Sequence, residues 1–298
     1  MNNLNTQVAG EYKLVAVQPD GTERILANWF PNLITNAGLN RMGTASDYTN
    51  NCQVGTGSTT PQFTDTALVS SLAAQSSVTT TSTSEATAPL YQRTITKRFR
   101  FNTGVATGNL TEVGVGWATT GSLFSRALIL DGSGNPTTVT VLSTETLDVY
   151  YRLTIYPYIN DITGTIELGG EEYSYTMRAA SLDTLLGVTS SASTVNSSLA
   201  SGFAGNGVLS AINTRPTNTN SYSFDPGIVP AAYSNNSYQR TGTLTFGLTA
   251  ANITGGIRNI YFRFGWGYWQ IEFSPTIPKN STNTLSLTFT HSWARKTS

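Results

Sequence analysis

The sequence has very few residues that commonly carry out catalysis or bind metals. Among 298 residues there is one cysteine, Cys52, and one histidine, His291. A single cysteine excludes an intramolecular disulfide framework and a metal site built from several cysteines. One histidine and one cysteine also leave no plausible Ser-His-Asp, Cys-His or His-ligated metal site. We therefore predict no catalytic residues, no bound metal, no cofactor and no enzymatic activity, and we interpret His291 as a partly buried structural residue.

Charge is also scarce. Charged residues make up 11% of the chain, and 17 basic residues balance 17 acidic ones. A typical soluble domain has about 25% charged residues. The surface must therefore be covered mainly by Ser, Thr, Asn and Gly, which suits a β-rich protein held in a large assembly better than a free enzyme. Zero net charge predicts no nucleic-acid partner. The local basic cluster of Arg93, Lys97, Arg98 and Arg100 is interpreted as the solvated face of a strand.

Long apolar runs are missing as well. No stretch approaches the roughly eighteen apolar residues that a membrane-spanning helix needs, so we expect no membrane insertion. The first seven residues have neither a basic start nor an apolar run and do not resemble a signal peptide. These features predict synthesis in the cytoplasm.

Three patterns that resemble catalytic or binding motifs are interpreted as structural. Residues 55–60 are rich in Gly, Ser and Thr, but they lack the Lys-Ser/Thr ending of a phosphate-binding loop. Glu171 and Glu172 are adjacent, so on a strand they would face opposite ways and could not flank one glycosidic bond. The spacing of four other carboxylates likewise favours no catalytic pair: Asp131, Glu145, Asp148 and Asp161.

What the sequence does contain is an internal repeat. Residues 91–94 (Tyr-Gln-Arg-Thr) recur at 238–241, a Gly-Trp step at 116–117 recurs at 265–266, and Thr-Leu at 146–147 recurs at 284–285. Three matches in the same order, with length changes that fall in predicted loops, indicate a duplicated domain. We predict two domains, at residues 1–157 and 158–298.

Alternating apolar residues predict that both copies are built from strands. In residues 147–155 every second residue is apolar, and 285–293 repeats this phase with Leu, Leu, Phe, His and Trp. Such alternation indicates one buried and one solvated face. The expected elements are an opening hairpin at 11–30, one short helix at 35–42 capped by Thr35, and strands near 92–102, 109–118, 122–130, 137–142 and 146–156. The fold class is therefore all-β, with two tandem, duplicated β-sandwich domains. The Ser/Thr/Gly-rich segments 43–90 and 181–237 are expected to form long loops, the first with a weak helical patch near residues 65–72.

Aromatic residues gather in one short segment of the second copy. Phe262, Phe264, Trp266, Tyr268 and Trp269 lie within eight positions. The alternating members are expected to pack in the core. Tyr268 and Trp269 fall near a predicted turn, where exposed rings would contact a neighbouring subunit or stack on a glycan. Core packing is the favoured interpretation, and among the exposed alternatives a subunit interface comes before sugar binding.

Several segments of the first copy resemble structural proteins of tailed bacteriophages, usually described as tail-fibre or minor tail proteins. These segments are residues 32–41, 52–61, 65–68, 108–117 and 123–127. The resemblance covers about the first 157 residues, and it extends to the second half only through the repeat. It implies a viral virion component that assembles with copies of itself and with other tail or head proteins, and it brings no catalytic residues.

The expected function is thus that of a non-enzymatic virion structural protein, located in the phage particle and placed in the tail as a fibre, collar or adaptor protein. Two similar domains per chain suggest a homo-oligomer, either a trimer on a six-fold tail ring or a hexamer. The alternatives are a capsid decoration or head-fibre protein and a protein that binds a host-surface glycan. The absence of a long coiled coil and of a repetitive β-helix favours a compact adaptor, collar or proximal tail piece over a long shaft.

Overall fold

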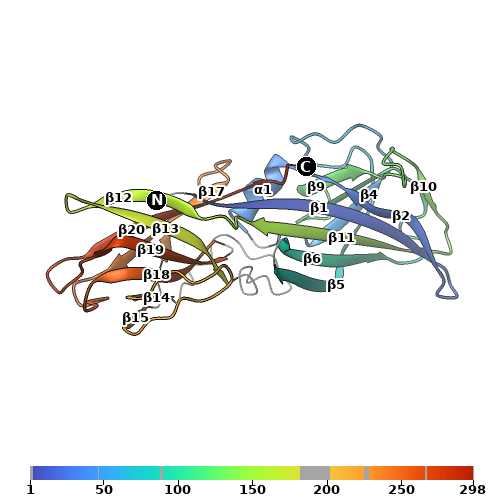
Figure 1. Cartoon of the computed structure of the whole chain (residues 1–298). Helices are drawn as coiled ribbons and strands as arrows, with labels where there is room; N and C mark the ends of the chain where they lie inside the picture. Colours follow the sequence, from blue (N-terminus) through green and yellow to red (C-terminus); the bar gives the residue numbers. More distant parts are fainter. Residues whose placement is uncertain are drawn as a thin grey trace.

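The chain folds almost entirely into β-strands. The computed structural model describes residues 3–45, 47–87, 90–181, 202–224, 228–265 and 267–297. Figure 1 shows an elongated molecule with two lobes side by side, one built mainly from the first half of the chain and the other mainly from the second. The predicted all-β, sandwich-like fold class is confirmed.

The N-terminal lobe contains the single helix of the described residues. Its elements are β1 (Asn3–Val17), β2 (Glu23–Pro31), β3 (Leu33–Ile34), α1 (Asn36–Met42), β4 (Asn51–Gly55), β5 (Ser71–Thr87), β6 (Leu90–Phe101), β7 (Gly108–Leu110), β8 (Glu112–Gly116), β9 (Leu123–Leu128), β10 (Val139–Val141) and β11 (Thr146–Pro157). The predicted helix and its cap are confirmed, because the Thr35 hydroxyl accepts a hydrogen bond from the Gly38 amide.

The C-terminal lobe consists of strands throughout its described part. They are β12 (Ile162–Leu168), β13 (Glu171–Ser181), β14 (Gly202–Gly205), β15 (Ser221–Phe224), β16 (Ile228–Pro230), β17 (Gln239–Phe246), β18 (Ile257–Phe264), β19 (Gly267–Ile277) and β20 (Leu285–Arg295).

The two lobes repeat one strand order. In the N-terminal lobe β3-β9-β8-β4-β5 form one layer, and in the C-terminal lobe β13-β19-β18-β14-β15 follow the same order, with β12 added at the end. The second layers correspond as β5-β6-β11 and β16-β17-β20. The long strand β5 belongs to both layers of its lobe, because it pairs with β4 in one layer and with β6 in the other. In the C-terminal lobe two strands take these places: β15 in the first layer and β16 in the second. The domain limits at residue 157 remain a prediction.

Strand β1 belongs to both lobes. Its residues 6–17 pair with β11 in antiparallel register, and its residues 3–8 pair with β20 in parallel register. Consequently one sheet continues from β17 and β20 through β1 into β11 and β6. The two chain ends lie in the lobes opposite to their sequence halves: β1 starts beside β20, and β20 ends beside α1 (Figure 1).

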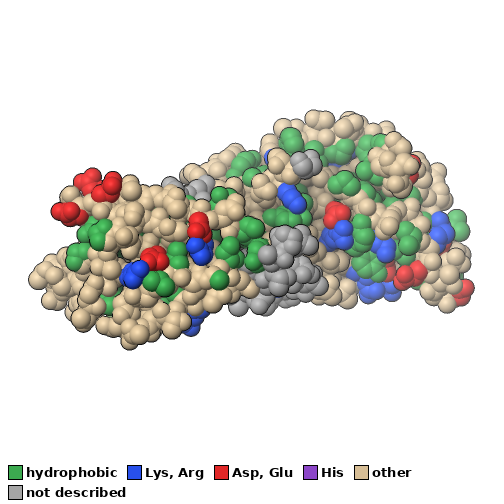
Figure 2. Space-filling view, viewed as in Figure 1, with side chains coloured by type: hydrophobic (Ala, Val, Ile, Leu, Met, Phe, Trp, Pro, Cys, Tyr) green, Lys and Arg blue, Asp and Glu red, His purple; other side chains and the backbone are tan. Residues whose placement is uncertain are grey.

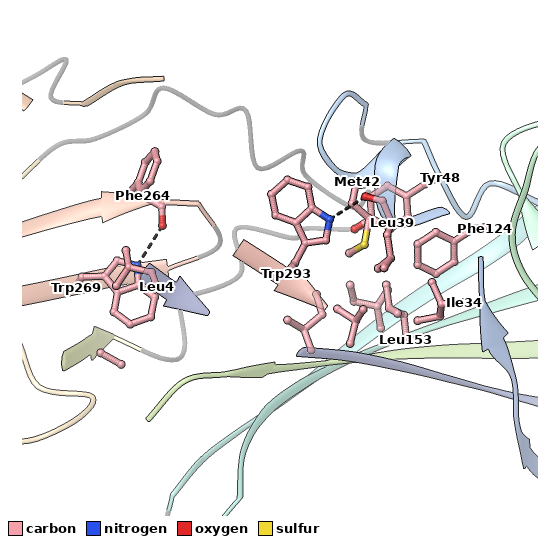
Figure 3. Packing of buried hydrophobic residues seen from close by; sticks show 14 of the residues in the cluster. Leu4, Ile34, Leu39, Met42, Tyr48, Phe124, Leu153, Phe264, Trp269 and Trp293 are labelled. Atoms are coloured by element: carbon pink, nitrogen blue, oxygen red, sulfur yellow. Dashed lines mark hydrogen bonds between the residues drawn. The ribbon is translucent and has the colours of Figure 1, made fainter. Parts of the chain in front are cut away.

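The inward faces of the strands form one continuous apolar core. Alternate residues of β11 (Leu147, Val149, Tyr151, Leu153 and Ile155) are buried, as are their counterparts in β20 (Leu285, Leu287, Phe289, His291 and Trp293). Figure 3 shows Leu4 of β1 beside Trp269, and Trp293 of β20 beside Leu39. The predicted alternation is confirmed for both strands.

Two sequence-based expectations about loops and charge are wrong. Residues 43–90 contain β4 and β5, and the described residues of 181–237 contain β14, β15 and β16; residues 182–201 lie outside the described part. No helix forms at 65–72. Lys97 is not on a solvated face: it is 2% exposed and shares the inward face of β6 with Phe99, whereas Arg98 and Arg100 face the other way toward Asp148.

Candidate functional site

The described residues contain no group of three or more His, Cys, Asp or Glu side chains that could hold a metal ion. Cys52 and His291 are both fully buried. Burial lowers the pKa of His291 to about 4. Its Nε2 lies 2.9 Å from the Thr6 hydroxyl, so this side chain connects β20 to β1. The structural interpretation of His291 is confirmed, and its burial is complete rather than partial.

The carboxylates considered for a catalytic pair all have structural partners. Asp148 accepts two hydrogen bonds from Arg100, and Glu145 accepts three from Arg24 and one from the Leu142 amide. Asp131 accepts backbone amides within its own turn, which lowers its pKa. Asp161 pairs with Arg178. Each carboxylate therefore holds a turn or a strand pair.

Glu171 and Glu172 lie at the tip of the β12–β13 hairpin. Glu172 pairs directly across the hairpin with Glu167, and all three glutamates are exposed. Figure 2 shows this acidic tip at the far end of the C-terminal lobe, on a surface otherwise dominated by uncharged side chains. Like charges opposite one another on a hairpin are mildly destabilising. The glutamates at this tip therefore do not stabilise the hairpin.

A buried ion pair anchors the long loop between β4 and β5. The Glu112 side chain is fully buried, and its carboxylate accepts hydrogen bonds from Arg126 and from the backbone amides of Gly57, Val69 and Ser70. Arg126, 1% exposed, also donates to Asp65 and to the Thr59 carbonyl. A buried charge is tolerated when it is paired and its remaining hydrogen-bonding capacity is used, as it is here.

This anchor explains the loop pattern at residues 55–70. The amides and carbonyls that Glu112 and Arg126 bind come from both ends of the loop, so its Gly- and Ser-rich sequence is held by side chains of β8 and β9 and not by a phosphate. A Cβ atom at Gly57 would lie 2.4 Å from the Glu112 carboxylate. Residues 52–61, 65–68, 108–117 and 123–127 thus include both members of this ion pair and most of the loop that it fixes.

Helix α1 forms the junction between the lobes. The Trp293 indole donates to the Leu39 carbonyl (2.8 Å), and Arg295 donates to the Ile34 carbonyl and the Asn36 side chain. From the β16–β17 connection, the Tyr233 hydroxyl donates to the Asn40 side chain. Figure 3 shows Trp293 on one side of Leu39 and Met42, with Tyr48 and Phe124 on the other side. Residues 32–41 therefore contact both the last strand of the chain and the β16–β17 connection.

A cleft of about 900 Å³ opens beside this junction. The Arg295 guanidinium lies 4.1 Å from the centroid of the Phe63 ring, and the Lys296 ammonium lies 3.8 Å from that of Tyr156. Phe63 is 51% exposed. The cleft thus combines two cations with two aromatic rings, where the last residues of the chain meet β1.

Of the two residues proposed for surface contact, one is buried. Trp269 is 1% exposed, and its indole nitrogen donates to the Phe264 carbonyl. The favoured core packing of Trp269 is confirmed, and its alternative as an exposed contact residue is wrong: Trp269, Ile271 and Phe273 alternate on the inward face of β19, a period-two signal that the sequence already contains. Tyr268 points the other way and is partly exposed. Trp266 lies outside the described residues.

Tyr268 belongs to a row of stacked rings on the outer face of the C-terminal lobe. Phe203, Tyr261 and Tyr268 lie on β14, β18 and β19, with ring centroids 5.2 and 5.3 Å apart and rings within 19° of parallel. Arg215 lies over Phe203, and Arg263 lies near Tyr268. Because Phe203 is 3% exposed and lies under Arg215, the row offers solvent only parts of Tyr261 and Tyr268 and not a flat platform for a sugar.

A hollow of about 320 Å³ lies at one end of the row. It is lined by Phe203, Arg215, Pro216, Thr217, Asn218 and Ser221. Most of these side chains are polar, and Arg215 supplies a cation at its edge. Such a lining suits a hydroxyl-rich or anionic ligand better than an apolar one.

In comparisons with known proteins, no family model, curated protein or solved structure matches the chain. Within the described residues, no helix has the length and hydropathy of a membrane-spanning segment.

Proposed function

We propose that the protein is a non-enzymatic structural component of a bacteriophage virion, placed in the tail as a fibre, collar or adaptor protein. The observation that carries the proposal is the structural use of the segments that resemble phage proteins. They supply the Glu112–Arg126 anchor, the loop that it holds, and helix α1 with its contacts to Trp293 and Arg295. These contacts hold the segments in place, which supports a structural role for them.

The surface supports assembly through protein contacts. The sequence is only 11% charged, and the visible face in Figure 2 is mostly uncharged. Within the described residues β2 pairs with β1 alone, so its outer edge ends the sheet along nine residues. Exposed edges are sites where another chain can add a strand, and a closed ring of subunits covers them. A trimer or a hexamer of the chain is the proposed assembly.

The location in the particle tests the proposal directly. Antibodies against the purified protein are applied to intact phage particles and viewed by electron microscopy, with antibodies against a head protein as the control. Labelling at the tail, with three or six copies per particle by quantitative mass spectrometry, is expected. Labelling over the head would replace the tail role with a capsid decoration role, and no labelling would overturn the virion assignment.

Assembly state gives a second measurement. Size-exclusion chromatography with light scattering should show a mass of three or six chains at high protein concentration. A stable monomer at every concentration would count against self-assembly through the exposed edges.

Glycan binding is a second candidate, favoured by the polar hollow beside Arg215. If it occurs there, Arg215→Ala should abolish binding on a glycan array, whereas Arg258→Ala, which removes an arginine paired with Glu272 on the same lobe, should preserve it. An array without any bound glycan would remove this candidate.

A further inference from the structure

Lys97 is a lysine in the core of a β-sandwich. It follows the inward alternation of β6 with Ile95, Phe99 and Phe101, and only 2% of its surface is exposed. Its cross-strand neighbours are Tyr151 of β11 and Thr80 of β5. Lysine is almost never fully buried unless its ammonium is paired, because removing a charge from water is costly.

The partner of this lysine is a neutral amide. Lys97 Nζ donates to the Asn50 side-chain oxygen at 2.9 Å. Asn50 ends a turn in which its own amide donates to the Asp47 carbonyl, and the next residue begins β4. A primary amine on the inward face of β6 and a half-buried carboxamide just before β4 are therefore held together at hydrogen-bond distance.

We propose that Lys97 and Asn50 join in an intramolecular isopeptide bond that fastens β6 to the start of β4. Lys97 Nζ, in its neutral form, attacks Asn50 Cγ. A new Nζ–Cγ bond forms, the Cγ–Nδ2 bond breaks, and Nδ2 leaves as ammonia after taking a proton from Nζ. The atoms balance without an oxidant, a reductant or any co-reactant, and only ammonia is lost.

Two features of the site favour this reaction. Burial lowers the pKa of Lys97 to about 8, so a useful fraction of the amine is neutral near physiological pH, although the Asp47 charge opposes this shift. The second feature is positioning, since two groups that are held in contact react as if they were present at very high concentration. The Asp47 carboxylate lies in the same turn as Asn50 and accepts two hydrogen bonds from Arg41 through Oδ1; it is the group proposed to carry the proton from Nζ to Nδ2.

A second Lys–Asn contact in the chain provides an internal comparison. Lys279 Nζ lies 2.9 Å from Asn252 Oδ1, but it also donates to the carbonyl of Asn280 and lies 3.5 Å from that of Leu248. Burial lowers the pKa of Lys279 as well, but three oxygen acceptors stabilise its ammonium form, whereas Lys97 donates to the Asn50 oxygen. Lys279 should therefore remain unmodified, although its distance to the amide is the same.

Mass spectrometry of the full-length protein decides the matter. The intact wild-type chain should be lighter than its sequence mass by the mass of one ammonia, about 17 Da. Asn50→Ala and Lys97→Met should each have their full sequence mass. Digestion with trypsin and a glutamate-specific protease should give a branched peptide in which residues 94–98 are attached to Asn50 in a peptide that spans residues 42–85. Tryptic cleavage after Arg93 removes the direct chain connection between the two segments, and cleavage after Glu85 shortens the Asn50 peptide.

Each outcome has a defined meaning. A wild-type mass equal to the sequence mass would overturn the proposal, and this measurement stands even if the variants fail to fold. Loss of ammonia that maps to a succinimide at another asparagine would also overturn it. Linear peptides at Lys279 together with a branched peptide at Lys97 would support it, and Asp47→Ala should then lower the cross-linked fraction of freshly folded protein.

Discussion

At the scale of single residues, the few ionisable groups in the core are the ones that hold distant strands together. His291 of β20 contacts Thr6 of β1 and is enclosed by Phe264 and Trp269. At Gly265, in the left-handed region with φ 64°, an added Cβ would lie 1.6 Å from His291 Nδ1. Gly265 corresponds to Gly116 in the internal repeat. In this lobe a glycine is needed at residue 265 because any side chain would collide with His291.

His291 makes the stability of the protein depend on pH. Its pKa is about 4 in the folded state against 6.5 for an ordinary histidine, so the unfolded chain binds the proton more tightly. Folding stability should therefore be complete above pH 6.5 and should fall as the pH drops from 6.5 toward 4, by about 2 kcal/mol at pH 5. Urea unfolding at pH 7.5, 6 and 5 measures this change.

The control exploits the fact that the chain has one histidine. An NMR titration of the folded protein gives a single imidazole signal, which should not titrate above pH 5. His291→Gln should show a flatter dependence of stability on pH across the same window. A midpoint near 6.5 in the folded protein would contradict the explanation.

The Glu112–Arg126 pair should be far more important than exposed ion pairs. In Glu112→Gln the buried Arg126 loses one of its two carboxylate partners and keeps only the partly exposed Asp65, and the loop amides lose an ionic acceptor, so we expect a loss of about 3 kcal/mol. Glu11→Gln is the matched control, because Glu11 also binds an arginine through two hydrogen bonds but is 34% exposed; it should cost about 1 kcal/mol or less. Equal losses in urea unfolding would show that burial does not set the strength of these pairs.

At the scale of whole elements, the first strand determines how the two halves are joined. Leu4, at the start of β1, is fully buried beside Trp269 of the other lobe (Figure 3). Leu4→Ala should cost about 2–5 kcal/mol because it leaves a cavity there. Hydrogen–deuterium exchange should show lost protection in residues 290–295 of β20, which pair with this end of β1.

Leu248→Ala is the control for that substitution, since Leu248 is 50% exposed and lies in the C-terminal lobe itself. It should change stability by about 0.5 kcal/mol at most. If Leu4→Ala disturbed only the N-terminal lobe and left the exchange of β20 unchanged, the role assigned to β1 would be wrong.

The elements that sequence reasoning found are those with a strong local signal. Alternation located β6, β8, β11 and β20, and Thr35 and Gly43 marked the ends of α1. Strand β5 was missed because its residues are mostly Ser, Thr and Ala, which give no apolar alternation; its strand state comes from pairing with β4 and β6 on either side. The first residues of β1 were missed for a similar reason, since their parallel partner lies almost a full chain length away.

The candidate surfaces, like the strands, were predictable only where the local sequence carries a signal. Tyr268 and Trp269 are neighbours in sequence, and only the phase of β19 separates the partly exposed ring from the buried one. The cleft at Arg295 and Lys296 could not be predicted from the sequence, because its walls come from β1, the loop at Phe63 and the chain end. Contacts of this kind depend on how strands from both halves pair, and local sequence patterns do not encode that pairing.

At the scale of the molecule, the shared strand and the exchanged chain ends make the two lobes one mechanical unit. Repeated domains joined only by a linker unfold separately. Here the buried apolar residues of both lobes form one cluster, one sheet runs through both lobes, and Trp293 and Arg295 bind α1 across the junction. Such continuity opposes bending between the two lobes.

This continuity predicts cooperative unfolding of the whole chain. Calorimetry should show one transition whose calorimetric and van't Hoff enthalpies agree, with an unfolding enthalpy of about 200 kcal/mol near 60 °C for a chain of this length. Trp293→Phe removes the hydrogen bond that the indole donates to the Leu39 carbonyl. Because a buried hydrogen bond is lost, this substitution should lower the single transition temperature without splitting the transition. Two separate transitions in the wild-type protein, each with about half of the enthalpy, would show that the lobes are independent domains despite the strand that they share.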